Sequence, residues 1–436
     1  MKKISVVGLG YIGLPTAILA AQNNYTVYGF DVDQKKIDSI NSGITPIQEP
    51  EIQERLNCVL NKKTFSASAQ LQPSDCFIIT VPTPFKAEKK ADLSFVFDAT
   101  KKIASKLKPG NLVLLESTVP VGTTQKITKI LEQKTKLTAK KDFFVAHCPE
   151  RVLPGKIFKE LVENDRIIGG ICAQSSEKAK CFYKKFVKGN CYISDDKTAE
   201  MVKLIENSSR DIQIALANQI AGMCAQKDMN PFEVIELANK HPRVNILQPG
   251  CGVGGHCIAV DPWFLIESFP QNTQLLKNAR AINDVKPQIV IEEILHKSKQ
   301  FTKKPNILVL GLTFKPDIDD MRESPALHIA KELNKIKQNF NLHICEPNIK
   351  KKHLKSIGFE NLTTLEEGSL IADMVVILVK HSIFKRLTPQ QLKNKVVIDP
   401  CGLQHTLNIK NCEEKYETTS CPKRNGKTVR STNSSL

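Results

Sequence analysis

The chain alternates between short apolar runs and longer stretches in which apolar residues recur every three or four positions. In the first 150 residues the short runs predict buried strands, and they fall at 4–7, 26–30, 76–81, 111–116 and 143–146. A helical pattern over 14–22 separates the first two runs. The alternation returns after residue 300, where strands are expected at 306–311, 341–345, 374–379 and 395–399. Such alternation is typical of α/β folds with helices on both faces of a mainly parallel sheet.

The middle of the chain has a helical period instead. Apolar residues follow an i, i+3/i+4 rhythm from Thr198 to about Lys227, and Pro231 begins a second helical stretch that ends near Lys240. We therefore predict an α/β protein with two Rossmann-like doubly wound domains, joined by a central helical domain with a long helix. The expected divisions are 1–197, 198–300, 301–410 and a disordered polar tail at 411–436.

The first strand leads directly into a glycine motif, Gly8-Leu-Gly10-Tyr-Ile-Gly13. In this context the first glycine turns the chain, the second admits a pyrophosphate, and the third lets helix and strand pack closely. The second strand ends in Asp31, where an acid binds a ribose 2′-hydroxyl and repels a 2′-phosphate, so NAD is favoured over NADP. The candidate cofactor-binding residues are Gly8, Gly10, Tyr11, Ile12, Gly13, Asp31, Lys36, Thr83 and Thr118.

Polar residues follow three later strands of this first third. Thr83, Thr118 and the pair Glu150 and Arg151 each come shortly after a buried strand. The carboxyl ends of strands form the ligand crevice of an open α/β sheet, so these side chains are expected to line one crevice. Each loop taken alone can equally be an ordinary turn.

The predicted long helix carries three polar residues on one face, Lys203, Asn207 and Arg210. Such a stripe usually faces solvent, but the apolar residues around it favour a buried helix with one polar patch. Long apolar helices between two nucleotide-type domains also often form dimer interfaces, so we expect a homodimer through this helix.

Residues 249–262 contain four glycines, Cys257 and Asp261. So much glycine indicates that the backbone turns tightly or passes close to something bulky. A thiol presented by such a loop can act as an activated nucleophile, whereas a buried cysteine in a glycine-rich turn would give the same pattern. A zinc site from Cys251, His256 and Cys257 is disfavoured because the paired ligand spacing is absent, and we predict no metal.

The first strand of the C-terminal third is followed by a charged stretch at 312–325, which lacks the G-x-G-x-x-G pattern. Lys315 and Arg322 in this stretch can hold phosphates. Arg243, which precedes the cysteine loop, is either a surface charge or a clamp for a carboxylate or phosphate. A ligand site is therefore expected between two α/β domains.

The composition restricts both the type of ligand and the cellular compartment that we expect. The net charge of +17 suits an anionic ligand, but the lysine pairs are dispersed and lack interleaved aromatics, which disfavours nucleic acid. Thirteen cysteines without regular spacing do not form a disulfide framework. No secretory segment begins the chain, and no apolar run reaches the roughly 20 residues that span a bilayer. We expect a cytoplasmic protein with reduced thiols and no membrane insertion.

Three segments together resemble the UDP-glucose/GDP-mannose dehydrogenase family, and the resemblance extends over residues 1–405. They are Cys148-Pro-Glu-Arg-Val-Leu-Pro-Gly155, His241-Pro-Arg-Val-Asn-Ile-Leu-Gln-Pro-Gly250 and Gly254-Gly-His-Cys-Ile-Ala-Val-Asp-Pro-Trp-Phe264. Within the family they are most similar to members that act on UDP-N-acetyl-D-mannosamine. Pro154 stands where members acting on UDP-glucose typically have a second glutamate, which argues against UDP-glucose. Cys251 stands where close relatives have proline, and oxidation could cross-link it with Cys257.

The resemblance implies a four-electron oxidation of a sugar C6 alcohol by NAD, through a thiohemiacetal and a thioester on Cys257. The product would be UDP-N-acetyl-D-mannosaminuronate, for a surface polysaccharide. Arg243 would reach the substrate from a second subunit. The implied catalytic residues are Cys257, Lys203, Asn207, Asp261, Thr118 and Glu150. The implied substrate-binding residues are Arg151, Val152, Lys203, Asn207, Arg210, His241, Arg243, Gly254, Phe314, Lys315 and Arg322.

Three alternatives remain open. A relative acting on UDP-N-acetylglucosamine or UDP-glucose would have the same chemistry and a different pocket. A two-electron hydroxyacid-type dehydrogenase would need no thiol, so replacement of Cys257 by serine would leave it active. A non-catalytic NAD-binding sensor is disfavoured because Lys203, Asn207, Cys257 and Asp261 occur together.

Overall fold

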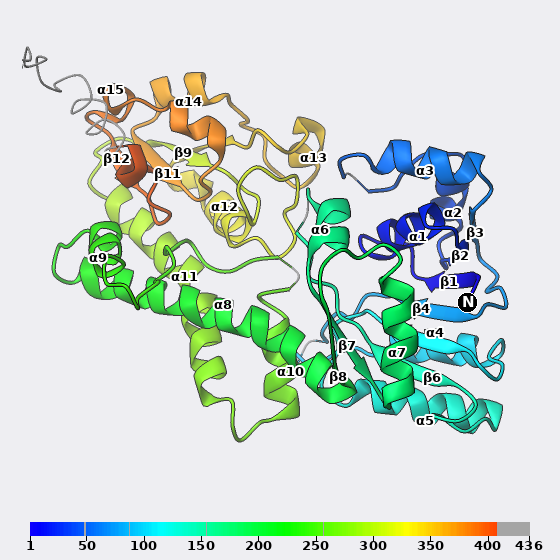
Figure 1. The fold of residues 1–436 in the computed structure, drawn as a ribbon. Helices are drawn as coiled ribbons and strands as arrows, with labels where there is room; N and C mark the ends of the chain where they lie inside the picture. Colours follow the sequence, from blue (N-terminus) through cyan, green and yellow to red (C-terminus); the bar gives the residue numbers. More distant parts are fainter. Residues whose placement is uncertain (48, 87, 154, 256, 408–436) are drawn as a thin grey trace, which may run out of the picture. The chain divides into compact units, whose positions relative to one another are not determined.

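The computed structural model describes residues 1–47, 49–86, 88–153, 155–255 and 257–407, and it divides into two compact units. The N-terminal unit comprises Met1–Gln213 and His256–Ala281, and the C-terminal unit comprises Ile214–Gly255 and Ile282–Leu436. Two of the three boundaries between the units fall inside helices, α8 (Asp196–Ala225) and α11 (Gln274–Ser298) (Figure 1). The predicted domain limits therefore stay a prediction, and the predicted tail at 411–436 lies outside the described residues.

The N-terminal unit is built on an eight-stranded sheet in the order β3-β2-β1-β4-β5-β6-β7-β8 (Figure 1). All neighbouring strands are parallel except β6 and β7, which are antiparallel. The strands are β1 (Lys3–Val7), β2 (Thr26–Phe30), β3 (Phe65–Ser68), β4 (Cys76–Ile79), β5 (Leu112–Leu115), β6 (Phe144–His147), β7 (Arg166–Gly170) and β8 (Cys191–Asp195). The order reverses at β1, which makes the carboxyl end of this strand the switch point where ligands bind in open α/β sheets.

Helices cover both faces of this sheet because alternate strand residues point to opposite sides. Ile4 and Val6 of β1 belong to the core under α1 and α7, whereas Val7 belongs to the core under α4 and α5. The helices of the unit are α1 (Gly13–Gln22), α2 (Gln34–Asn41), α3 (Ile52–Asn61), α4 (Ser94–Ala104), α5 (Thr123–Thr135), α6 (Ile157–Glu163), α7 (Ala173–Tyr183) and α10 (Asp261–Ser268), with the first part of α8. The doubly wound arrangement predicted from the sequence is confirmed.

The C-terminal unit contains a four-stranded parallel sheet in the order β10-β9-β11-β12. Its strands are β9 (Asn306–Leu310), β10 (Asn341–Cys345), β11 (Met374–Ile377) and β12 (Val396–Ile398). The helices are α9 (Pro231–Ala238), α12 (Pro325–Lys335), α13 (Lys351–Ser356), α14 (Leu365–Ile371), α15 (Pro389–Leu392) and most of α11, with 3-10 turns at Lys337–Asn339 and Ser382–Arg386. The four strands predicted for this region are confirmed.

The sequence analysis missed three strands, and among the helices of the described residues it located only α1, α8 and α9. β3, β7 and β8 lack a continuous apolar run: β3 is half serine, β7 runs from Arg166 to paired glycines, and β8 is largely exposed. α11 has a weak apolar stripe and contains Pro287, which normally disfavours a helix interior. In the described part of the chain no helix has the length and apolar character needed to cross a membrane.

Helix α1 starts so close to the turn after β1 that only glycine fits at Gly13. A Cβ atom there would lie 1.9 Å from the Gly8 carbonyl oxygen and 2.4 Å from the Thr80 hydroxyl oxygen. These two oxygens are themselves joined, because the Thr80 hydroxyl donates to the Gly8 carbonyl at 2.7 Å. No heavy atom lies within 4 Å of the corresponding position at Gly10.

Gly13→Ala should therefore destabilise the protein by about 1–3 kcal/mol, because either α1 or Thr80 must move. Gly10→Ala is the matched control, since its methyl group meets open space, and its free energy of unfolding should stay within about 0.5 kcal/mol of wild type. Thermal unfolding of both variants measures the difference. Equal melting temperatures for the two variants would contradict this account of the turn.

Candidate functional site

The turn after β1 in the N-terminal unit has the geometry expected of a dinucleotide-binding loop. Gly8 has φ +101°, a conformation that favours glycine, and its N–H donates to the Phe30 carbonyl at 2.8 Å. The next N–H, that of Leu9, donates to the Asp31 carboxylate at 2.8 Å. Open space beside Gly10 leaves room for a phosphate next to the N-terminus of α1. These residues fit NAD, as the motif predicted.

Asp31 is buried and carries its charge. Its carboxylate also accepts the N–H of Asp33 at 3.1 Å and pairs with Lys36 at 2.9 Å. Burial alone would raise the pKa of Asp31, but the hydrogen bonds from Lys36 and from the backbone hold this pKa below its usual value. The anion can accept a ribose hydroxyl and disfavours a 2′-phosphate.

Three further hydrogen bonds connect the loops around this turn. The Tyr11 hydroxyl donates to Glu49, and the same carboxylate oxygen of Glu49 accepts the N–H of Gly155 at 2.6 Å. Thr83 donates its hydroxyl to the Thr118 carbonyl at 2.7 Å, which joins the loops after β4 and β5. The sequence analysis did not identify Glu49, because its carboxylate lies between elements in a loop without a recognisable motif.

A chain of hydrogen bonds joins the long helix to the cysteine loop within the N-terminal unit. Asn207 of α8 donates its side-chain N–H to the Asp261 carboxylate at 2.6 Å. Asp261 is the first residue of α10, and its own N–H donates to the Cys257 carbonyl at 2.8 Å. Cys257 and Lys203 are both half-buried. The structure therefore places Asn207, Asp261 and the backbone of Cys257 together.

Asp261 is nearly fully buried, and this sets its proton affinity. Burial raises the pKa of Asp261 to about 6, although the charge of Lys203 and the hydrogen bond from Asn207 both favour the carboxylate. Such a carboxylate is largely ionised at neutral pH and is a stronger base than an exposed aspartate. It is a good candidate for a group that exchanges a proton with a substrate.

Glu150 belongs to a buried network that the sequence analysis missed. Its carboxylate pairs with Arg166 at the start of β7, and the Arg166 guanidinium lies 4.2 Å above the Tyr183 ring. The same guanidinium lies 3.7 Å from Glu116, which also accepts the Tyr183 hydroxyl at 2.6 Å. Burial raises the pKa of Glu116 to about 7, against the opposing charge of Arg166. The single buried guanidinium of Arg166 thus pairs with two carboxylates.

The neighbouring residue Arg151 is engaged by protein groups. Its guanidinium pairs with Glu206 of α8 at 2.8 Å and donates to the Asp165 carbonyl at 3.2 Å. Its carbonyl accepts an N–H from Asn164 at 2.9 Å. The 150–153 loop is therefore held from several sides. Val152 is half-buried on this loop, and Arg210 is exposed on α8.

The remaining predicted residues lie in the C-terminal unit, where the glycine-rich segment packs on the loop after β9. A Cβ atom at Gly254 would lie 2.6 Å from the Glu323 carbonyl, and one at Gly255 would lie 2.9 Å from the Phe314 ring. The Gly255 N–H donates to the Arg322 carbonyl at 3.1 Å. The bulky neighbour that the glycines indicated is thus the Phe314 loop.

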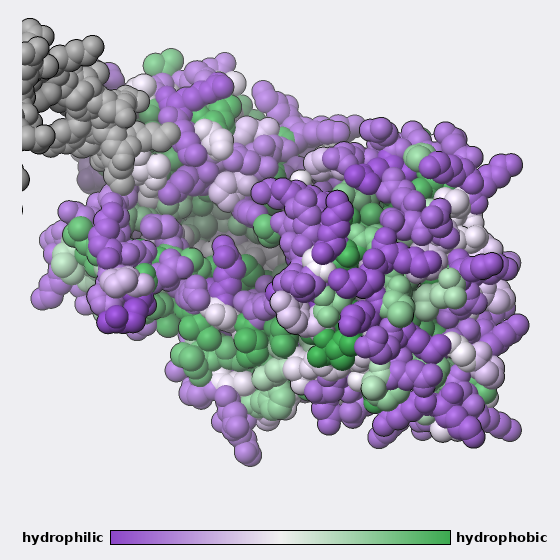
Figure 2. Space-filling view, viewed as in Figure 1, coloured by the Kyte–Doolittle hydropathy of each residue, from purple (hydrophilic) through white to green (hydrophobic). Residues whose placement is uncertain are grey.

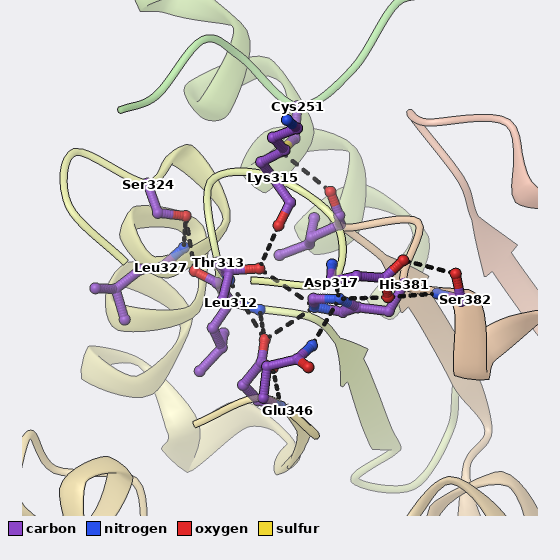
Figure 3. A network of polar contacts seen from close by, with 12 residues as sticks. Cys251, Leu312, Thr313, Lys315, Asp317, Ser324, Leu327, Glu346, His381 and Ser382 are labelled. Carbon is purple, nitrogen blue, oxygen red and sulfur yellow. Dashed lines mark hydrogen bonds and ion pairs between the residues drawn. The ribbon is translucent and has the colours of Figure 1, made fainter. Parts of the chain in front are cut away.

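That loop is held by the network drawn in Figure 3. Glu346, at the end of β10, accepts the N–H groups of Leu312 at 2.6 Å and Thr313 at 3.3 Å. Ser324 donates its hydroxyl to the Leu312 carbonyl at 2.7 Å, and it caps α12. Lys315 and Arg322 both stay exposed, as residues that bind an anion must.

His241 and Arg243 occupy an exposed loop that Asn239 closes. The Asn239 side chain donates to the Ile246 carbonyl at 2.9 Å and accepts the N–H of Ile246 at 2.7 Å. The Arg243 N–H donates to the His241 ring at 3.3 Å. The loop therefore presents both side chains to its surroundings.

Cys251 and Cys257 belong to different units, and their predicted cross-link stays a prediction. Cys251 is buried, and its thiol donates to the Leu378 carbonyl at 3.4 Å. Burial raises the pKa of Cys251 to about 12, so this thiol is a poor nucleophile. His256, one ligand of the disfavoured zinc site, lies outside the described residues.

Comparisons with known proteins agree with this arrangement. Residues 2–187 match the NAD binding domain of the UDP-glucose/GDP-mannose dehydrogenase family, residues 197–285 its central domain, and residues 308–405 its UDP binding domain. The UDP-N-acetyl-D-mannosamine dehydrogenase of Campylobacter jejuni is 48% identical over 392 residues, which cover 88% of this chain and 96% of that protein. An NDP-N-acetyl-D-galactosaminuronic acid dehydrogenase of Ralstonia nicotianae is 45% identical over 409 residues, 92% of this chain and 96% of that protein.

A solved structure extends the likeness to three dimensions. The structure of the UDP-D-ManNAc dehydrogenase from Pyrococcus horikoshii matches with a TM-score of 0.83 and 40% identity. The match covers 92% of this chain and 96% of that chain. With the glycine motif, the anionic Asp31 and the three matching domains, the cofactor is NAD. The chain belongs to the UDP-glucose/GDP-mannose dehydrogenase family.

Proposed function

We propose that this protein oxidises the C6 alcohol of UDP-N-acetyl-D-mannosamine to the carboxylate, with two NAD consumed for each sugar. The observation that carries the proposal is the hydrogen-bonded arrangement of Asn207, Asp261 and the Cys257 backbone, with half-buried Lys203 on the same helix as Asn207. The Cys257 carbonyl accepts the N–H of Asp261, and the charge of Lys203 acts on the Asp261 carboxylate. A cysteine at this position provides for an acyl-enzyme stage, which a two-electron dehydrogenase does not need.

The first oxidation removes a hydride from C6 and a proton from its hydroxyl group. NAD, when bound, accepts the hydride in each of the two oxidations. Asp261, ionised at neutral pH, accepts the hydroxyl proton directly or through water. Lys203 stabilises the oxygen as negative charge develops on it, and the Asn207 amide keeps Asp261 oriented.

The second oxidation uses Cys257. Its thiol adds to the C6 aldehyde to form a thiohemiacetal, and loss of a second hydride from C6 together with the proton of the C6 hydroxyl leaves a thioester. Water then attacks the thioester carbonyl, releasing the sugar carboxylate and restoring the thiol. Glu150, held by Arg166, and Thr118 are the groups proposed to position this water.

The identity of the sugar is the most specific part of the proposal. Relatives with 43–48% identity are named for UDP-N-acetyl-D-mannosamine, and one with 45% identity is named for N-acetyl-D-galactosaminuronic acid. UDP-N-acetylglucosamine and UDP-glucose are the alternatives, and Pro154 disfavours UDP-glucose. The exposed Lys315 and Arg322 are proposed to bind the diphosphate. We propose that the reaction takes place in the cytoplasm and that its product is used to synthesise a surface polysaccharide.

The test of the proposal is the number of NADH formed per UDP-N-acetyl-D-mannosamine consumed, with NAD in excess. We expect a ratio of about two, since each hydride carries two of the four electrons. Cys257→Ala should lower the ratio to about one or stop turnover, because no thioester can form. Cys251→Ala is the matched control and should keep the ratio of the wild type, since that thiol is buried in the C-terminal unit. A ratio of two in Cys257→Ala would overturn the thioester route.

The pH dependence of the reaction tests the role of Asp261. The base must be ionised, so kcat/KM should fall as the pH falls through about 6, approaching about tenfold per pH unit at lower pH. Asp261→Asn should lower kcat and remove this limb of the profile. Asp228→Asn, at an exposed position, is the control and should keep it. An unchanged acid limb in Asp261→Asn would assign the proton transfer to another group.

A homodimer through the central helices is also part of the proposal. Leu216 and Met223 of α8 are 46% and 53% exposed, and Val285 and Ile289 of α11 are 48% and 46% exposed. Figure 2 shows apolar side chains on the surface of α8 and α11. Such helical apolar surface is typical of an obligate interface. The exposed Arg243 would then reach the substrate of the second subunit.

The double substitution Leu216→Glu with Ile289→Glu should convert a dimer to a monomer in sedimentation, because in a two-fold interface each charge is introduced twice. Leu370→Glu is the control, since Leu370 is 79% exposed on α14 of the same unit. The control should keep the association state of the wild type. A wild-type monomer at micromolar concentration would contradict the dimer.

A further inference from the structure

We propose that His381 is a positioning residue for the loop of residues 312–322, which we call the Lys315 loop, and that it sets the affinity of this loop for a nucleoside diphosphate. The inference rests on the proposed function, in which Lys315 and Arg322 bind the diphosphate. It goes further by assigning a role to a buried histidine that touches the loop and not the ligand.

One ring nitrogen of His381 holds the middle of the Lys315 loop. The N–H of Asp317 donates to His381 Nδ1 at 2.9 Å (Figure 3). Asp317 has φ +60°, a conformation that non-glycine residues rarely adopt without support. Ser382 supplies that support by donating its N–H at 2.8 Å and its hydroxyl at 2.6 Å to the Asp317 carboxylate. Residues 381 and 382 together fix Asp317 through three hydrogen bonds.

The other ring nitrogen faces the start of the loop. His381 Nε2 lies 3.2 Å from the Glu346 carboxylate and 3.3 Å from the Thr313 hydroxyl. The Thr313 hydroxyl donates to the Lys315 carbonyl at 2.9 Å. Because a backbone N–H can only donate, Nδ1 is the unprotonated nitrogen and Nε2 carries the proton. The ring therefore accepts from Asp317 and donates toward Glu346 and Thr313.

Packing fixes the ring in this orientation. His381 is fully buried, and its ring meets Phe384 edge-on with 5.2 Å between centroids. Glu346 is oriented in turn by Leu312, Thr313 and the N–H of Asn348 at 2.8 Å. A rigid ring with donor and acceptor on opposite sides thus connects the two ends of the segment that bears Lys315. Exposed lysine binds an anion more tightly when its backbone is held in place beforehand.

The N-terminal unit shows why this use of Glu346 is distinctive. Asp31 and Glu346 occupy equivalent places, since each follows the second strand of its sheet and accepts the N–H after the glycine that ends the first. The partner of Asp31 is Lys36, whose side chain is 28% exposed, whereas the partner of Glu346 is the fully buried His381. Glu346 therefore holds the Lys315 loop, and His381 prevents its carboxylate from binding a ribose.

Two substitutions separate the two ring nitrogens. In His381→Asn the side-chain oxygen lies near the place of Nδ1 and can still accept the Asp317 N–H. In His381→Gln the amide lies near the place of Nε2, so the contact with Glu346 is kept and that with Asp317 is lost. Both changes remove the ring, so a purely structural role would lower the melting temperature and the affinity alike in the two variants.

The probe is UDP, titrated by calorimetry into the full chain, with NAD titrated separately. We expect His381→Gln to weaken UDP binding about tenfold, equivalent to about 1.4 kcal/mol, with NAD affinity unchanged. His381→Asn should stay within about threefold of wild type. Equal losses in both variants, or a parallel loss of NAD affinity, would overturn the proposal.

The exposed residue Ser382, which also binds Asp317, provides a second test if the His381 variants fold poorly. Ser382→Ala removes one hydrogen bond to Asp317 and should weaken UDP binding about threefold, whereas Ser356→Ala removes an exposed hydrogen bond outside the loop and should not. UDP binding that is the same in Ser382→Ala as in wild type would count against the proposal. Wild-type protein that binds no UDP would refute the proposed diphosphate site itself, a result distinct from the failure of His381.

Discussion

A buried carboxylate that accepts the first N–H after a glycine turn is the interaction on which both halves of this protein depend. Asp31 accepts the N–H of Leu9, and Glu346 accepts that of Leu312. In each sheet this contact fixes the turn that leads from the central strand to the ligand-facing edge. The two carboxylates then serve different ends. Asp31 can still accept a hydrogen bond from a ribose, whereas Glu346 is covered by His381 and holds the Lys315 loop.

Burial also gives the candidate catalytic groups their chemistry. Asp261 gains its raised pKa from the loss of water around it, and Asn207 keeps the carboxylate in one orientation. Around Glu150 the relevant charge is that of the buried Arg166, which pairs with both Glu150 and Glu116. A carboxylate on the surface would be a weaker base and would have no fixed direction. The enzyme's proton chemistry is thus a property of the core packing as much as of residue type.

Much of this fold could be predicted from the sequence because its main strands are buried on both faces and appear as unbroken apolar runs. The glycine motif and Asp31 were predictable for a different reason, because their spacing is dictated by one local turn. The links made by Glu49, Arg166 and His381 were not, because each joins residues of different elements that are distant in the chain, as in Asn348 with His381. Arg166 itself stands at the first position of β7, a strand too short in apolar residues to be predicted.

The conformation of the glycine-rich segment is set by the loop on which it packs. Gly255 packs against Phe314 and donates to the Arg322 carbonyl, and Cys257 follows it by two residues. Any side chain at Gly254 or Gly255 would push this segment off the Phe314 loop. The glycines are therefore required by this close packing, which explains why so flexible a sequence stands at this point of the chain.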